Sequence, residues 1–192
     1  MSRPDYTPLE VVKPQPIWSN APRHCPRKSL PPYAYVPGQN PHPLRHPQGH
    51  SFYKPYGPQA LPVADWRKHP AYLYGVDLYH QSFFWEAHEV WEALWKMATK
   101  NSPEHLFYQT LILNTAALLK IRQEEFAGVR KHSLKSQAKL AALIEMVNQN
   151  TFQGLHLSRF QTDLTRFYGP LWKNQKIKLA LDQDPPRLNL NF

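Results

Sequence analysis

The sequence predicts an all-α fold, a bundle of about five helices with an extended, proline-rich N-terminal arm packed on it. Beyond residue 62, apolar residues recur at helical spacing, and no strand-like alternation of useful length is present. Fifteen of the 20 prolines lie before Val63, where they exclude helices. The 192 residues suit one domain with an appendage. We therefore divide the chain into an arm (1–62), a helical domain (63–180) and a C-terminal tail (181–192).

The arm combines its prolines with large aromatic side chains. Prolines remove backbone donors and favour polyproline II, turns and extended chain, whereas disordered tails are usually poor in aromatic residues. We therefore expect at least residues 30–56 to wrap over the helical domain and to dock their aromatic side chains on it. Residues 1–29 are expected to be mobile.

Three histidines of the arm, His42, His46 and His50, are spaced four residues apart. Pro43 and Pro47 exclude the helix that would place them on one face, but turns in an extended chain can still bring them together. Two interpretations stay open. The histidines are polar turn residues packed under aromatic side chains, or they bind a metal such as zinc, for which imidazole is a common ligand.

The first two helices are predicted from proline, serine and the apolar pattern. Proline suits a first helical turn, so the first helix is expected from 70 to about 80, with Gly75 marking a close helix contact. Ser82 is expected to cap the second helix, which should end near residue 99. At about 100° per residue, the second helix carries an apolar stripe of Phe84, Ala87, Trp91, Leu94, Trp95 and Ala98.

The third helix is expected from 103 to about 123, because Ser102 is a good capping residue and Pro103 suits the first helical position. It is apolar on nearly all sides, which predicts a central place in the bundle. Its interior polar residues must then find hydrogen-bond partners. These residues are Gln109, Thr110, Asn114 and Thr115.

The last two helices are delimited by glycine, serine and proline. Gly128 is expected to precede a fourth helix at about 129–147, which has a basic side. Ser158 is expected to cap a fifth helix that runs to about 167 and is stopped by Gly169 and Pro170. From residue 182 the chain is expected to be a loose tail.

Polar residues of the second helix form the candidate site. His88 and Glu92 lie one turn apart at the edge of the apolar stripe, with Glu89 one step further round. The letters H-E-x-x-E resemble H-E-x-x-H, in which the outer residues bind a metal and the inner glutamate is a base. His88 and Glu92 are thus candidate ligands of a divalent metal, and Glu89 is the candidate catalytic base of a hydrolysis. The alternative is a structural His–Glu hydrogen bond at the edge of the core.

Three further residues complete the candidate binding pocket. Gln109 of the third helix could face the His/Glu pair, and His132 of the fourth helix, Gln109 or a histidine of the arm could supply the further ligands that a metal needs. Glu86 is included as well. It falls nearly opposite the apolar stripe, so its carboxylate is expected in solvent or beside a basic residue such as Lys120 or Arg130.

Three stretches, WEAHEVWEALW, FYQTLILNTAALLK and GVRKHSLKSQAKL, resemble the bacterial and archaeal family called domain of unknown function 309. The family hallmark, EAHE-x-x-E-x-x-W, is matched by Glu86, His88, Glu89, Glu92 and Trp95. The resemblance covers residues 74–143 approximately. It implies an all-helical fold and the same candidate site, but it assigns no activity.

Two positions of the third helix depart from the family pattern. Gln109 matches a family glutamine, but the usual next glycine is Thr110 here and a second family glutamine is Leu113. His132 matches a histidine of the following helix. The proline-rich stretch PPYAYVPGQNPHP, with GHSF after it, resembles an extension found in a subset of members.

Composition narrows the remaining classes of function. The net charge of +9 is shared, with seven basic against two acidic residues up to position 62 and 16 against 12 beyond it. Cys25 is the single cysteine, which predicts a reducing compartment. No stretch approaches the roughly 18 apolar residues of a membrane span, and no signal-peptide pattern opens the chain. We expect a cytoplasmic protein without membrane partners.

Two non-enzymatic alternatives stay open, and the sequence does not decide whether the protein is an enzyme. The basic side of the fourth helix and the arm could hold RNA or another polyanion, although no nucleic-acid motif is present. Alternatively, the three tryptophans of the second helix could pair with a second copy in a homodimer. No phosphate-binding loop, dinucleotide fingerprint or Ser/Cys nucleophile motif points to another enzyme class, and no small-molecule substrate can be named.

Overall fold

The computed structural model describes residues 14–18, 20–52, 65–174 and 183–192. Within these ranges the secondary structure is almost entirely helical, as the sequence predicts. The elements are η1 (Trp66–Lys68), α1 (Pro70–His80), α2 (Phe84–Met97), α3 (Pro103–Arg122), α4 (Phe126–Val147), β1 (Thr151–Phe152), β2 (Leu155–His156) and α5 (Leu157–Trp172). No helix in the described ranges has the length and apolarity needed to cross a membrane.

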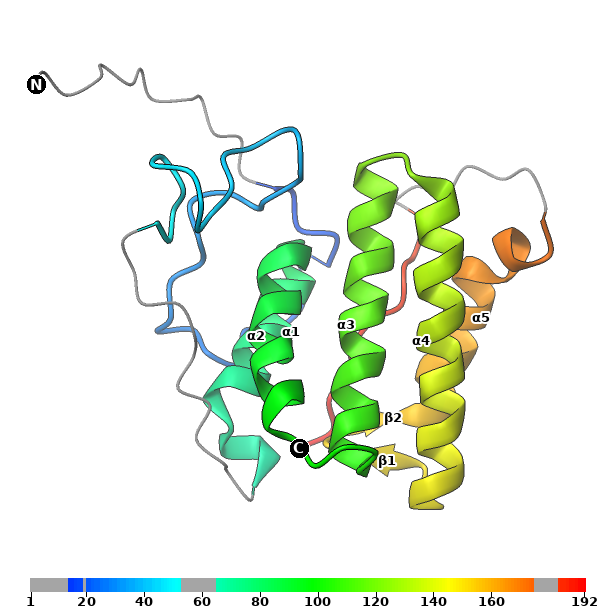
Figure 1. Cartoon of the computed structure of the whole chain (residues 1–192). Coiled ribbons are helices and arrows are strands. Elements are labelled where there is room, and N and C mark those ends of the chain that lie inside the picture. The colour runs from blue at the N-terminus through cyan, green and yellow to red at the C-terminus, as the bar shows by residue number, and fades with distance from the viewer. Residues whose placement is uncertain (1–13, 19, 53–64, 175–182) are drawn as a thin grey trace, which may run out of the picture.

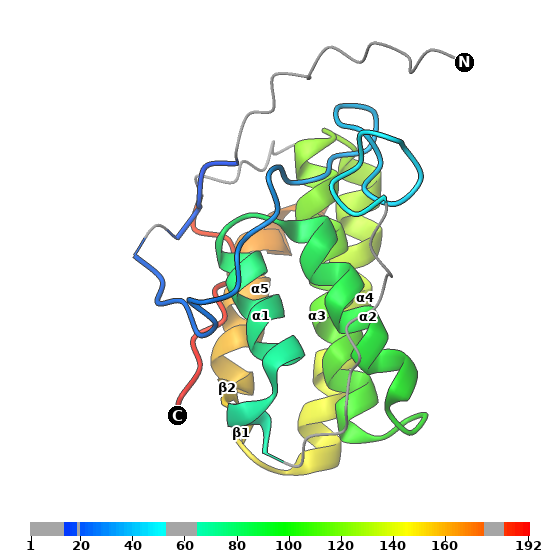
Figure 2. The same ribbon diagram turned by 90° about the vertical axis from the view of Figure 1, so that its left-hand side faces the viewer.

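The five helices form two layers. Figures 1 and 2 show α2, α3 and α4 side by side in one layer, with α1 and α5 behind them. α3 lies in the middle and packs against both α2 and α4, which fits its apolar circumference. β1 and β2 form a short antiparallel hairpin between α4 and α5, and Leu155 of β2 also bridges to Leu190 near the C-terminus.

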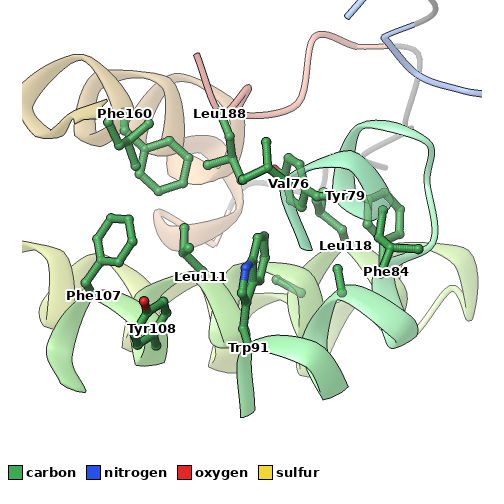
Figure 3. Packing of buried hydrophobic residues seen from close by; sticks show 14 of the residues in the cluster. Val76, Tyr79, Phe84, Trp91, Phe107, Tyr108, Leu111, Leu118, Phe160 and Leu188 are labelled. Atoms are coloured by element: carbon green, nitrogen blue, oxygen red, sulfur yellow. The ribbon is translucent and has the colours of Figure 1, made fainter. Parts of the chain in front are cut away.

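The hydrophobic core fills the space between the layers. Figure 3 shows Trp91 of α2 and Leu111 of α3 pointing toward Tyr79 of α1 and toward Leu188. Trp91 is fully buried, and its Nε1 donates a hydrogen bond to the Tyr72 carbonyl at 3.3 Å. Gly75 makes this contact possible, because a Cβ there would overlap the Trp91 indole. The predicted close helix contact at Gly75 is confirmed.

Asn114 of α3 organises the polar part of the core. Its Nδ2 donates to the Tyr79 hydroxyl at 2.8 Å, and its Oδ1 accepts from the Tyr168 hydroxyl at 3.0 Å. The Tyr79 hydroxyl in turn donates to the Pro186 carbonyl. α1, α3, α5 and the C-terminal segment are thus joined by one satisfied network, as a buried amide requires.

Two predicted helix starts are wrong. Ser82 does not cap α2, because it is fully buried in the left-handed region (φ 67°) and its Oγ accepts a hydrogen bond from the Ile17 N–H of the arm. Gly128 does not precede α4 but lies inside its first turn, against the Lys120 side chain. The break before α4 is at Glu124, which has a left-handed φ of 55°.

The C-terminal predictions are also corrected. The N-cap of α5 is His156, not Ser158, because the His156 Nδ1 accepts from the Arg159 N–H. α5 continues past Pro170 to Trp172. The described part of the expected loose tail, residues 183–192, is docked: Leu188 is 2% exposed.

The described part of the arm lies on the helical domain (Figure 2). Its docking begins before residue 30, so the expected mobility is wrong for residues 14–18 and 20–29, whereas residues 1–13 and 19 lie outside the described residues. Trp18 is buried and stacks on Tyr79 with ring centroids 5.1 Å apart. Asp77 of α1 accepts from the Arg23 Nε at 3.1 Å and from two backbone N–H groups, those of His24 and Cys25, at 2.7 and 2.8 Å. Residues 53–56 of the predicted docking segment lie outside the described residues.

Candidate functional site

His88, Glu89 and Glu92 lie together on the outward face of α2, where all three side chains are half-buried. Each offers one ligand atom, and these atoms lie within 4.8 Å of one another. In the part of the chain that the structure describes, no other set of three or more His, Cys, Asp or Glu residues is arranged this closely. We call these three residues the α2 cluster.

The contacts of the α2 cluster do not include the structural hydrogen bond between His88 and Glu92 that was the alternative to a metal site. His88 and Glu92 do not pair with each other; each has another charged neighbour. The His88 Nδ1 lies 3.5 Å from the Glu89 Oε1 but forms no hydrogen bond with any described residue, although the atom is buried. The Glu92 Oε2 lies 3.1 Å from the Nζ of Lys96, which is largely exposed. The predicted i, i+4 His–Glu hydrogen bond is therefore not formed.

His132 lies on α4, which packs on α3, and it is not among the residues whose ligand atoms meet within 4.8 Å in the α2 cluster. Burial lowers the pKa of His132, and the positive charges of Lys131, Lys120 and Lys135 lower it further. His88 also lowers it, as the last of these causes. The Nδ1 of His132 is buried and has no hydrogen-bond partner among the described residues. A neutral imidazole with an unpartnered nitrogen is the form that binds a metal.

Gln109 lies elsewhere than predicted. It lines a surface pocket of about 550 Å³ together with Trp95, His105 and Lys139. Its Oε1 is buried without a hydrogen-bond partner in the described ranges, and so it does not bond to His88 or Glu92. Gln109 is thus part of a separate pocket beyond the C-terminal end of the α2 cluster.

Glu86 is the clearest correction, because its carboxylate is not in solvent. The residue is 5% exposed, and its Oε1 accepts a hydrogen bond from the Tyr35 N–H of the arm at 2.9 Å. The His50 Nε2 lies 3.2 Å from the same oxygen. Helical periodicity considers only neighbours within one helix, whereas these two partners come from a segment that covers the first turn of α2.

The basic residues expected beside Glu86 are engaged elsewhere. The Lys120 Nζ pairs with Glu125 at 2.6 Å, and the Arg130 Nη2 donates to the Trp172 carbonyl at 3.4 Å. The basic side chain near Glu86 is Arg122, whose pKa is lowered by burial and raised by the Glu86 carboxylate. Glu86 therefore anchors the arm and is not part of the α2 cluster.

The three histidines of the arm do not meet at one point. His42 and His46 each accept a backbone N–H bond at Nδ1, from Leu44 at 3.2 Å and from Gln48 at 3.1 Å. His50 is turned toward Glu86. The first interpretation, polar turn residues packed near aromatic side chains, describes this arrangement. Sequence spacing could not reveal the pairing of His50 with Glu86, because 36 residues separate them.

The tryptophans of α2 are covered within the chain. Trp91 is fully buried, Trp85 packs edge-on against Tyr35 of the arm at a centroid distance of 5.2 Å, and Trp95 packs on His105 at 5.1 Å. Much of the apolar surface from which a homodimer was inferred is thus contacted by the chain itself. Homodimerisation stays a prediction.

Comparisons with known proteins support the resemblance seen in the sequence. The family model described as Domain of unknown function (DUF309) matches residues 72–132, which span α1, α2, α3 and the start of α4. A search of curated proteins and a search of solved structures each found no match. The matched segment contains the α2 cluster, Gln109 and His132.

Proposed function

We propose that the α2 cluster binds a divalent transition metal and that the protein is a small metal-dependent hydrolase. The observation that carries the proposal is the convergence of three ligand atoms within 4.8 Å on one turn of helix. His88 and Glu92 are the ligands that α2 supplies, and His132 is the candidate third ligand from α4. The buried, unpartnered Nδ1 atoms of both histidines favour this assignment.

The donor set suits zinc, manganese or iron. One or two imidazoles with carboxylates are typical ligands of these metals, and catalytic sites keep an open position for water or substrate. The ion pair between Glu92 and Lys96 does not prevent metal binding. An exposed i, i+4 pair stabilises a helix by only about 0.3–0.5 kcal/mol, so a bound cation can displace the Lys96 ammonium readily.

Glu89 is the residue placed to move a proton. Its carboxylate lies 3.5 Å from the His88 ring, on the side of the helix where the metal would be held. A divalent metal, when bound, lowers the pKa of water toward neutrality. Glu89 would then accept the proton from the attacking water and return it to the leaving group.

Metal content is the direct test. Protein purified without an affinity tag, then offered zinc, manganese and iron, should retain on the order of one ion per chain by mass spectrometry of the elements. Glu92→Gln and His88→Ala should each lose it. Glu145→Gln, which changes an exposed carboxylate of α4, is the matched control and should keep it. Absence of metal from the parent under all three conditions would overturn the proposal.

Catalysis needs a separate test, because binding does not prove turnover. In a screen of generic carboxylic and phosphate esters, Glu89→Gln should keep the metal and lose about 10²- to 10⁴-fold in kcat, the usual contribution of a general base. Equal turnover by Glu89→Gln and the parent would exclude Glu89 as the base. A metal-loaded parent without activity on any ester would leave a metal-binding protein and reject the hydrolase.

A further inference from the structure

A second polar surface lies beside the α2 cluster, where α2 ends and α3 begins. It is the pocket of about 550 Å³ that contains Gln109. The pocket is built by α2, the loop after it, α3 and α4. The α4 contribution is Lys139. Its lining residues are Trp95, Lys96, Ala98, Lys100, Asn101, His105, Gln109 and Lys139. We call it the lysine pocket.

The lysine pocket is electropositive. Three lysines line it and no acidic residue does. Lys139 is half-buried, whereas Lys96 and Lys100 are exposed. The positive charges also act on His105. Its pKa is lowered mainly by burial and additionally by the charges of Lys139 and Lys100. Lys96 is partly neutralised by Glu92, so Lys100 and Lys139 supply most of the unbalanced charge.

Several polar atoms in the wall of the pocket are buried without a partner among the described residues. They are the Trp95 Nε1, the His105 Nδ1 and the Gln109 Oε1. Buried polar groups in proteins are nearly always hydrogen-bonded, to protein, water or a ligand. The indole N–H can only donate, so it requires an acceptor. The Trp95 and His105 rings lie 5.1 Å apart at 36° and form an aromatic wall next to these atoms.

We propose that the lysine pocket binds the phosphate group of a small phosphate monoester, with an aromatic or apolar group of the ligand against Trp95. Two unbalanced lysine charges match a dianion better than a carboxylate. The phosphate oxygens would accept hydrogen bonds from the ammonium groups of Lys100 and Lys139, which line the pocket. A pocket of this volume has the size of small-molecule sites.

Binding of a phosphate monoester does not depend on the proposed function, but its role as a substrate rests on that function. Lys96 contacts both the lysine pocket and Glu92 of the α2 cluster, so a bound phosphate ester would lie next to the metal ligands. It would then be the substrate class of the hydrolase. Binding itself depends on the lysines and not on a metal, and it can therefore be measured on protein treated with EDTA.

The test is calorimetric titration of the EDTA-treated full chain with phenyl phosphate. The double variant Lys100→Gln, Lys139→Gln should weaken binding by about tenfold or more, because charge-assisted hydrogen bonds are roughly twice as strong as neutral ones. The matched control is Lys131→Gln, Lys135→Gln, which removes two exposed charges of α4 outside the pocket. It should leave the Kd within about twofold, since exposed charges contribute little in salt.

Two further ligands sharpen the result. Inorganic phosphate should bind more weakly than phenyl phosphate, and phenol should not bind, if both the lysines and the aromatic wall are used. No heat with phenyl phosphate at millimolar concentration would overturn the inference. Equal weakening by the two double variants would also overturn it, because it would indicate a dispersed polyanion surface. Either failure leaves the metal measurement untouched, since that test uses other residues.

Discussion

The first and third turns of α2 each carry a glutamate, but the two carboxylates have opposite surroundings. Glu86 is buried, and its Oε1 is held by Tyr35 and His50 of the arm. Glu92 is half-exposed, and among the described residues it pairs with the flexible ammonium of Lys96. A carboxylate fixed by a backbone N–H and a buried imidazole is structural, whereas one held by an exposed lysine is available to a ligand. The arm makes this difference.

Truncating Glu86 should have the largest effect on stability. Glu86→Ala leaves the Tyr35 N–H and the His50 ring without their acceptor, and since each orphaned buried donor costs roughly 1–3 kcal/mol, the loss should be about 2–6 kcal/mol. Urea unfolding followed by circular dichroism measures the change. If Glu86→Ala is no more destabilising than Glu92→Ala, the contrast between the two turns is wrong.

Asp77 should come next, because it holds another part of the arm. Its buried carboxylate accepts from Arg23 and from two backbone N–H groups of residues 24 and 25. Asp77→Ala should lower the free energy of unfolding by about 2–4 kcal/mol, because an orphaned buried donor costs roughly 1–3 kcal/mol and these three donors belong to half-buried residues that water can partly reach. The same urea experiment applies, with exposed Glu145→Ala as the control that should change little.

A buried histidine of α1, His80, should make the free energy of unfolding depend on pH. Burial, reinforced by the positive charge of Arg187, lowers the pKa of His80 from 6.5 to about 3. The unfolded chain therefore binds a proton that the folded chain does not, so stability falls as the pH falls from 6.5 toward 3. Between pH 7 and pH 5 the loss from this group should be about 2 kcal/mol. His80→Phe should flatten this part of the urea-midpoint profile; an unchanged slope would exclude His80 as the cause.

Glu92 should have the smallest effect on the fold. Glu92→Gln removes only an exposed ion pair, so the free energy of unfolding in EDTA should change by less than about 0.5 kcal/mol. Zinc should raise the melting temperature of the parent but not that of Glu92→Gln, because a ligand stabilises only the state that binds it. A variant that zinc still stabilises as strongly as the parent would remove Glu92 from the ligand set.

Helix existence could be predicted because each signal was local. Ser102 and Pro103 start α3 as predicted, and the Ser102 Oγ accepts from the His105 N–H at 3.2 Å. Ser82 failed as a cap because Ile17, 65 residues away in sequence, uses its hydroxyl. Local signals determine where a helix can begin, and long-range partners decide whether a given polar group is needed elsewhere.

The candidate site was predictable to the same extent. Spacing on one helix brought His88, Glu89 and Glu92 together correctly. It misplaced Glu86, because the partners of that carboxylate come from the arm. It also misplaced Gln109, because antiparallel helices put this residue opposite Trp95 and Lys139. Neither the register of packed helices nor the path of an extended arm is encoded in residue periodicity.

The two ends of the described chain meet on α1, and this constrains the order of events during synthesis. Trp18 stacks on Tyr79, and the Tyr79 hydroxyl bonds to the carbonyl of Pro186. On the ribosome, α1 emerges about a hundred residues before its last cover, Leu188. At roughly 5–20 residues per second this leaves an apolar helix face unsealed for many seconds. The nascent chain is therefore vulnerable to aggregation and proteolysis until Leu188 has been synthesised.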